Sequence, residues 1–219
     1  MIVEARLMVS PRMLERLSAY RRLLAKWIAE KRERIYSHEL GALAGATPAQ
    51  VRRDVMTIGF TGSPARGYDA TGLLQRIGEL LDPQEPVRVA LLGVGFLGRA
   101  VLDYFSGRSP NYAIVAAFDV SSEKVGRVIH GVRCYHIEEL DEQAREQAID
   151  LGVIAVPAPV AQSVAERACR AGLRGLLNFA PAKLHVPPEV HVENVDLAVS
   201  LEKVAFFARH GSRRREVQS

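Results

Sequence analysis

Residues 93–98 read GVGFLG and follow directly after the apolar run Val87 to Leu92. Glycines in this spacing permit a tight turn, a close approach of the backbone to a diphosphate, and close packing of a following helix. Asp119 ends the next apolar run, 21 residues beyond Gly98. A carboxylate there accepts hydrogen bonds from the adenosine ribose and repels a 2′-phosphate, so the spacing predicts an NAD(H) site. The candidate contacts in the glycine segment are Gly93, Val94, Gly95, Phe96, Leu97 and Gly98.

Two short segments that contain proline follow later apolar runs, at the sheet edge where a parallel α/β fold binds ligands. Because the first two strands of such a fold hold the adenosine half of the cofactor, we expect both segments near the nicotinamide end. Simple termination of each strand by its proline is the alternative. The residues concerned are Val156, Pro157, Ala158, Asn178, Phe179, Ala180 and Pro181.

Polar residues in the first third of the chain could read nucleic acid. Thr47 and Pro48 combine a hydroxyl helix cap with proline at the first helical position, and residues 37–43 fit a helix just before them. Two helices joined by a short turn with glycine, here Gly45, form the helix-turn-helix pattern, in which the second helix enters the DNA major groove. Glutamine can bind adenine, arginine can bind guanine, and a helix amino terminus can hold a phosphate. The candidate contacts are Ser37, Thr47, Ala49, Gln50, Arg52 and Arg53.

The segment at residues 59–68, GFTGSPARGY, is rich in glycine. It suits a β-hairpin wing whose Arg66 lies on the phosphate backbone of DNA. A plain surface loop is the alternative for this segment. A solvated arginine face on an ordinary three-helix bundle is the alternative for the helices before it.

Helices must position these groups in the first third. Ser10 and Pro11 predict the start of an amphipathic helix of about six turns. Its apolar stripe is predicted to be Leu14, Leu17, Tyr20, Leu24, Trp27 and Ile28. The next two helices, the second of which ends at Gly59, are expected to pack through Leu40, Leu43, Val51 and Val55. Residues 71–81 predict a connecting helix.

The rest of the chain alternates apolar runs with helical patterns, which indicates a parallel sheet wound by right-handed crossovers. The predicted strands are 87–92, 113–118, 151–156, 176–179 and 190–195, and the predicted helices are 99–105, 138–147 and 159–171. A final amphipathic helix, 197–209, presents Leu197, Leu201, Val204 and Phe207 on one face. That face either docks on its own domain or is exchanged with a second subunit.

Charge is segregated along the chain. Residues 1–68 hold 12 Lys and Arg against 6 Asp and Glu, a net charge of +6, whereas residues 69–208 hold 13 against 18, a net charge of −5. The last eleven residues hold 4 against 1, a net charge of +3. A basic module on an acidic body indicates a polyanion-binding part joined to a part with another task. The segment 82–86, DPQEP, is the best candidate boundary.

Length and composition exclude several classes. The chain has 219 residues, of which 48% are hydrophobic, so disorder is excluded as the dominant state. No apolar run reaches the ~18 to 20 residues that cross a bilayer, and the charged amino terminus does not resemble a secretory signal. We therefore expect a soluble, cytoplasmic protein. Cys134 and Cys169 lack metal or disulfide spacing and are expected to be small buried hydrophobic residues, with no metal site.

The order of these parts resembles the Rex family of redox-sensing transcriptional repressors. The motifs that carry the resemblance are TPAQVRRD, RGY, GVGFLG, AAFD, GVRCYHIEEL, IAVPAPVAQ, LNFAP and ENVDL. The resemblance implies an amino-terminal winged-helix domain (1–82), a Rossmann NAD(H)-binding domain (87–195), and a carboxy-terminal helix with a basic tail (196–219). It also implies a homodimer that exchanges this helix and binds an inverted-repeat operator in double-stranded DNA. NADH is expected to weaken that binding and NAD⁺ to permit it.

The resemblance also implies a switch. Tyr104, Asp196 and Arg22 match family positions where the aspartate pairs with a tyrosine in one redox state and with an arginine of the partner in the other. Three departures stand out. Pro64 replaces a basic residue of the family wing, RDVMTIG replaces a segment that usually holds two aromatic residues, and Leu197 replaces a phenylalanine found in some relatives.

Two other functions fit the sequence less well. An NAD-dependent oxidoreductase would need a proton donor at the nicotinamide, and the sequence has no Tyr-x-x-x-Lys motif and no convincing histidine–carboxylate pair. The other alternative is a protein that binds DNA constitutively and has another nucleotide ligand, such as coenzyme A. Asp119 argues against it.

Overall fold

The computed structural model describes residues 9–63, 65–106 and 111–210. The chain divides into two compact units, Met1–Asp82 and Pro83–Ser219. Pro64 and the tail 211–219, both singled out in the sequence, lie outside the described residues.

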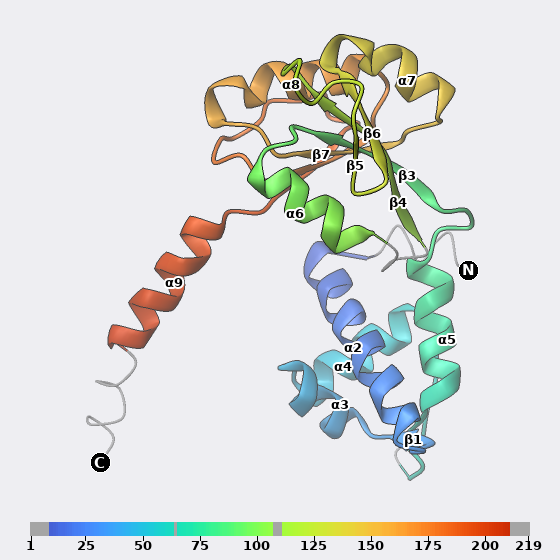
Figure 1. The fold of residues 1–219 in the computed structure, drawn as a ribbon. Helices are drawn as coiled ribbons and strands as arrows, with labels where there is room; N and C mark the ends of the chain where they lie inside the picture. The colour runs from blue at the N-terminus through green and yellow to red at the C-terminus, as the bar shows by residue number, and fades with distance from the viewer. Residues whose placement is uncertain (1–8, 64, 107–110, 211–219) are drawn as a thin grey trace. The chain divides into compact units, whose positions relative to one another are not determined.

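The described part of the first unit contains the helices α2 (Pro11–Ala29), α3 (Ser37–Ala44), α4 (Pro48–Thr57) and α5 (Ala70–Leu81) (Figure 1). A short antiparallel pair, β1 (Arg34–Ile35) with β2 (Tyr68–Asp69), closes it. The predicted capping signals are confirmed, because the Met13 amide donates to Ser10 Oγ over 3.3 Å and the Gln50 amide donates to Thr47 Oγ1 over 3.2 Å. Gly45, at φ +67°, ends α3 and allows the short turn to α4.

Two predicted core positions in this unit are wrong. The buried stripe of α2 is Met13, Leu17, Tyr20, Leu24 and Trp27, whereas Leu14 is 48% exposed. Met13 continues the three- and four-residue spacing from Leu17, and Leu14 lies ~100° further around the helix. Leu43 is also exposed, because Ala44 takes the inward position at the end of α3. Leu40, Val51 and Val55 are fully buried as predicted.

The second unit contains a seven-stranded sheet in the order β5-β6-β4-β3-β7-β8-β9. All neighbours pair in parallel except β5 and β6. Taken in chain order, the six parallel strands have the 3-2-1-4-5-6 arrangement of a Rossmann fold. The strands are β3 (Val87–Leu92), β4 (Tyr112–Asp119), β5 (Val128–Ile129), β6 (Val132–His136), β7 (Leu151–Ile154), β8 (Gly175–Asn178) and β9 (His191–Asn194).

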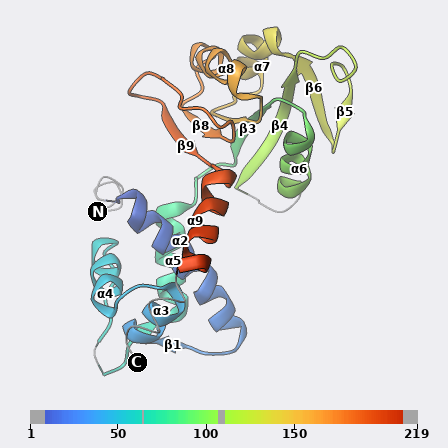
Figure 2. The ribbon, with the colours of Figure 1, turned by 90° about the vertical axis from the view of Figure 1, so that its left-hand side faces the viewer.

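Helices cover both faces of this sheet. α7 (Leu140–Glu146), which follows the 3-10 turn Ile137–Glu139, and α8 (Ala158–Arg170) lie on one face, and α6 (Phe96–Phe105) lies on the other (Figure 1, Figure 2). Ala90 and Leu92 of β3 therefore pack with the α7 and α8 side, and Val89 and Leu91 pack with the α6 side. Burial on both faces explains why β3 is apolar throughout.

The β5–β6 hairpin was not predicted. Its turn places His130 at φ +48° and Gly131 at φ +81°, which is the requirement of a type I′ turn. Histidine is uncommon at such a position, so the turn has no strong sequence signal. α6 also begins at Phe96, three residues earlier than predicted, so the second half of the glycine motif is the first turn of the helix.

The last helix, α9 (Leu197–His210), begins after Asp196, whose Oδ1 accepts the Val199 amide over 2.9 Å. Its apolar residues are not buried in the single chain. Leu197, Leu201, Val204 and Phe207 are 63%, 69%, 65% and 67% exposed. The expectation that this face docks on its own domain is therefore wrong for the single chain.

Candidate nucleotide site and nucleic-acid interface

The glycine motif lies at the carboxyl end of the central strand, between β3 and α6. Gly93 has φ +100°, and a Cβ there would lie 2.6 Å from Val156 Cγ1. A Cβ on Gly98 would collide with the carbonyl oxygen of Gly93, so glycine at this position lets α6 pack on the strand. A Cβ on Gly95 would meet nothing within 4 Å, and the backbone there faces open space.

The amino terminus of α6 carries no side-chain cap. Its first-turn amides and the helix dipole are therefore free to bind an anion, as a diphosphate requires. Phe96, in the first turn, is 99% exposed. Together with the open backbone at Gly95, this terminus fits the diphosphate of a dinucleotide.

Asp119 ends β4 and is held by three donors. The Val94 amide lies 2.8 Å from Oδ2, the Ser121 amide lies 2.9 Å from Oδ1, and Lys124 Nζ lies 2.9 Å from Oδ2. Burial alone would raise the pKa of Asp119, but the hydrogen bonds from Lys124, Ser121 and Val94 outweigh it and lower that pKa. The carboxylate is ionised at neutral pH and retains a lone pair for a ribose hydroxyl. Lys124 was not predicted, since nothing in the sequence marks it as the partner of Asp119.

A hollow of about 570 Å³ connects the motif to this carboxylate. Its walls include Gly93, Gly95 and Asp119, with Val156 and Pro157 at the start of α8. Apolar side chains, Phe118, Ile137, Val160 and Val164, offer surfaces for a flat base. The structure therefore groups Val156 and Pro157 with Asp119 in one hollow, because α8 begins at Ala158 and its first turns line that hollow.

The second proline segment lies in a different hollow, of about 280 Å³, which Asn178, Ala180 and Pro181 share with Asp196. Asn178 is 1% exposed. Its amide nitrogen donates to the carbonyls of Ala180 and Ala182 and to Asn194 Oδ1, and its oxygen accepts the Ala180 amide. The side chain therefore shapes this loop, and Phe179 packs against the sheet core on the α6 side.

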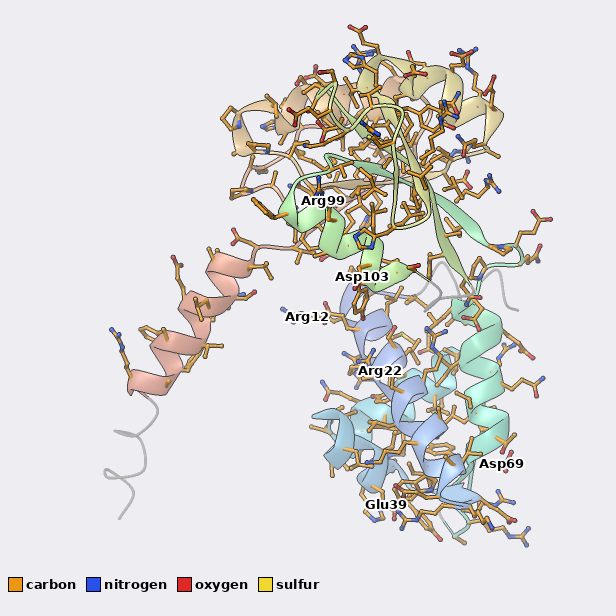
Figure 3. The ribbon with its side chains drawn as sticks, viewed as in Figure 1. Arg12, Arg22, Glu39, Asp69, Arg99 and Asp103 are labelled. Atoms are coloured by element: carbon orange, nitrogen blue, oxygen red, sulfur yellow. The ribbon has the colours of Figure 1, made fainter. Side chains whose placement is uncertain are left out.

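The three residues of the expected switch lie in three elements. Asp196 caps α9, Tyr104 on α6 is 61% exposed, and Arg22 on α2 is exposed (Figure 3). Arg22 belongs to the first unit and the other two to the second. The structure thus supplies a carboxylate and an exposed phenol in the second unit and an exposed guanidinium in the first.

The residues expected to read DNA on α4 lie on its exposed side. Ala49, Gln50, Arg52 and Arg53 are exposed, whereas Val51 is buried. Gln50 also completes a capping box, since its Oε1 accepts the Thr47 amide over 2.9 Å. In a bidentate contact with adenine, Oε1 of glutamine accepts a hydrogen bond from the adenine amino group. Gln50 would therefore have to give up its hydrogen bond with the Thr47 amide to make the predicted contact.

Arg52 and the expected wing line one hollow. Its Nη1 donates to Ser37 Oγ over 3.1 Å, and both residues line a hollow of about 590 Å³ with Ser63 and Tyr68. The loop is tied down at two points, by the Tyr36 hydroxyl on the Ala65 carbonyl and by the bridge between Ser63 and Gly67. Arg66 is exposed at its tip. Arginine, serine and backbone amides around one hollow are groups that bind phosphate.

The described residues were also expected to lack a metal site and a membrane span and to hold two buried cysteines. Within the described part of the chain, no group of three or more His, Cys, Asp or Glu side chains is arranged to hold a metal ion. Among the helices of residues 9–210, none combines the length and apolarity that crossing a membrane requires. Cys134 is buried and Cys169 only partly so, and burial raises the pKa of both thiols.

Comparison with known proteins covers both units. A family model described as "CoA binding domain" matches residues 84–182, and one described as "Putative DNA-binding protein N-terminus" matches residues 8–55. The redox-sensing transcriptional repressor Rex of Anoxybacillus flavithermus is 40% identical over 90% of this chain and 92% of its own length. The Rex protein of a Geobacillus species is 40% identical over 88% of this chain and 89% of its own length.

Solved structures agree with the sequence relatives. The Rex-family repressor RSP is 29% identical, with a TM-score of 0.86 over 97% of this chain and 99% of that chain. Its complex with NAD⁺ and operator DNA has a TM-score of 0.87 over 96% of this chain and 97% of that chain, again at 29% identity. The chain belongs to the Rex family of redox-sensing transcriptional repressors.

Proposed function

We propose that the protein is a redox-sensing transcriptional repressor, which binds an inverted-repeat operator as a homodimer and releases it when NADH replaces NAD⁺. The observation that supports the proposal is that one chain combines exposed polar side chains on α4 with open backbone at Gly95 and the Asp119 carboxylate at the ends of β3 and β4. RSP, the solved relative, has been crystallised with NADH and also with NAD⁺ and operator DNA.

Specific residues are assigned to each role within this proposal. Gly93, Gly95 and the amino terminus of α6 would hold the diphosphate, and Asp119 would hold the adenosine ribose. Ala49, Arg52, Arg53 and Arg66 would contact DNA, with Ser37 orienting Arg52. Residues 1–82 would form the DNA-binding part, 87–195 the sensing part, and 196–219 the exchanged helix and tail.

Asp196 would be the two-position element of the switch. A carboxylate that can pair with the phenol of Tyr104 or with the guanidinium of Arg22 from the partner has two discrete arrangements, which a ligand can bias. The nicotinamide ring is cationic in NAD⁺ and neutral in NADH, so a pocket that excludes water can distinguish the two. Only different affinities of the two cofactors for the two arrangements can shift DNA binding.

A mobility-shift titration tests the proposal. The protein is bound to the duplex that it selects from a random pool, and NADH or NAD⁺ is added to matched occupancy. We expect NADH to release the duplex and NAD⁺ to leave it bound. Equal effects of the two cofactors would overturn the redox-sensing function.

The family-model match to coenzyme A binding domains gives a second candidate ligand. Coenzyme A therefore belongs in the same titration, and we expect no release by it, because its adenosine carries a ribose phosphate that Asp119 repels. An assay for turnover of simple alcohols and hydroxy acids with NAD⁺ tests the oxidoreductase alternative, for which we expect no activity.

A further inference from the structure

Asp54 is a buried charge on the helix that is proposed to read DNA. It lies on α4 directly after Arg53, and it is 3% exposed. A carboxylate in that position is costly unless it is fully paired, so its partners must be part of the design of the unit. No sequence pattern suggested a role for it.

Two residues of α2 provide those partners. Arg16 binds Asp54 as a fork, with Nε 2.7 Å from Oδ2 and Nη2 2.7 Å from Oδ1. Tyr20, one helical turn further along α2, donates its hydroxyl to Oδ2 over 3.0 Å. Burial raises the pKa of Tyr20, and the hydrogen bond with Asp54 raises the pKa of Arg16, so both donors keep their protons at neutral pH.

The geometry of this network differs from that of the apolar contacts beside it. Val51 and Val55 bury α4 against the core, but the hydrophobic effect is non-directional and restricts a small rotation of the helix less than a hydrogen bond of fixed geometry does. A bidentate arginine–carboxylate pair does have fixed geometry. A rotation of about 20° about the α4 axis would move an arginine tip, about 8 Å from that axis, by about 3 Å. That displacement exceeds what a hydrogen bond to a base edge tolerates.

We propose that Asp54, held by Arg16 and Tyr20, is a positioning residue that sets the rotation of α4 and thereby the discrimination between the operator and other DNA. This inference rests on the proposed function. Asp54 itself contacts no DNA in this account. Its substitution should therefore reduce base reading more than it reduces attraction to phosphates.

The experiment compares three full-length variants with the wild type. Asp54→Asn keeps the shape of the side chain but removes its charge, and Arg16 can tolerate this because its side chain is 25% exposed. Tyr20→Phe removes one hydroxyl. Arg21→Gln is the matched control. Arg21 lies on α2, like Arg16 and Tyr20, and forms a 2.6 Å ion pair with Asp82 that is more exposed than the pair of Arg16 with Asp54.

Affinity is measured for the duplex that the wild type selects from a random pool and for a scrambled duplex of the same composition, across a salt series. For Asp54→Asn we expect the ratio of the two affinities to fall about 10-fold, the loss of roughly one base contact, while the salt slope on the scrambled duplex is unchanged. Tyr20→Phe should lower the ratio about 3-fold, less than Asp54→Asn, because the Arg16 fork still holds the carboxylate. Arg21→Gln should leave it within about 2-fold, as for an exposed ion pair.

If Asp54→Asn leaves the ratio of the two affinities unchanged, including the case in which both affinities fall equally, the inference is overturned. Failure of the wild type to select any duplex would instead overturn the proposed function. Folding is monitored by the fluorescence of Trp27, the one tryptophan of the chain, which is buried in the same unit and donates to the Arg34 carbonyl over 3.0 Å. If Asp54→Asn is unfolded at the assay temperature, the Tyr20→Phe ratio decides, and a value equal to the wild type overturns the inference.

Discussion

Asp119 is the carboxylate that we expect to bind the adenosine ribose of the cofactor. Three protein donors fix its position, and Asp119 lines the hollow. Loss of a hydrogen bond to a charged group costs about 1.5–3 kcal/mol, which corresponds to about 10- to 100-fold in affinity.

We therefore expect Asp119→Ala to weaken NADH binding about 10- to 100-fold, measured by the fluorescence of the bound cofactor. Asp103→Ala is the matched control, because Asp103 is an exposed carboxylate of the same unit, 3.7 Å from His130 (Figure 3). Equal affinities of the two variants would remove Asp119 from the site.

Lys124 has an effect on stability that depends on pH. The pKa of Asp119 is lower in the folded chain than its ordinary value, so the unfolded chain binds more protons between the two pKa values. This contribution to stability is present above pH ~4 and is lost as the pH falls through the lower, folded value. Lys124→Met removes a hydrogen bond that lowers the pKa, so we expect its melting temperature to fall less steeply than the wild type's as the pH drops from 5 to 3. Parallel curves would contradict the pairing.

At the scale of elements, two glycines of the motif have separable roles. A Cβ at Gly98 meets backbone, whereas a Cβ at Gly95 meets open space, and Gly95 has an extended conformation that alanine adopts without strain. Gly98→Ala should destabilise the second unit by about 1–3 kcal/mol, as expected for overpacking, in urea unfolding followed by circular dichroism. Gly95→Ala should unfold like the wild type but lose NADH affinity, since its methyl group occupies the path of the diphosphate. The reverse assignment of effects would contradict this account of the motif.

Local signals in the sequence were sufficient for most elements. Ser10, Thr47 and Gly45 mark helix ends that the structure contains, and the alternating pattern from Val87 onward predicted the parallel sheet. Elements without a local signal were missed, as with the His130 turn of the β5–β6 hairpin.

Side-chain partners were harder to predict than elements. Arg16 and Asp54 are 38 residues apart, and Asn178 uses its amide for its own loop, so neither role follows from spacing along the chain. Burial and pairing between distant segments decide these roles, and they are properties of the folded unit.

At the scale of the whole molecule, we expect a second chain to cover α9. A helix that presents several large apolar side chains to water is costly, at roughly 25 cal/mol for each Å² of apolar surface, and the residues of α9 are exposed throughout 197–209. Soluble proteins rarely expose such a face unless another surface covers it. Exchange of this helix in a symmetric dimer would bury the apolar face of α9 in both subunits.

We expect the wild type to be a dimer in sedimentation velocity, and the double variant Leu201→Glu with Val204→Glu to be a monomer at the same concentration. Each substitution places a charge where the other chain would bury an apolar side chain, which costs several kcal/mol. Lys203→Glu, on the same helix, is the control for charge and should remain a dimer. Because two reading helices must bind together to span an inverted repeat, the monomeric variant should lose more than about 10-fold in affinity for the full repeat but keep the wild type's affinity for a half-site. A double variant that stays dimeric would show that α9 is not the contact, and a monomer with full affinity for the repeat would show that dimerisation is not needed for reading it.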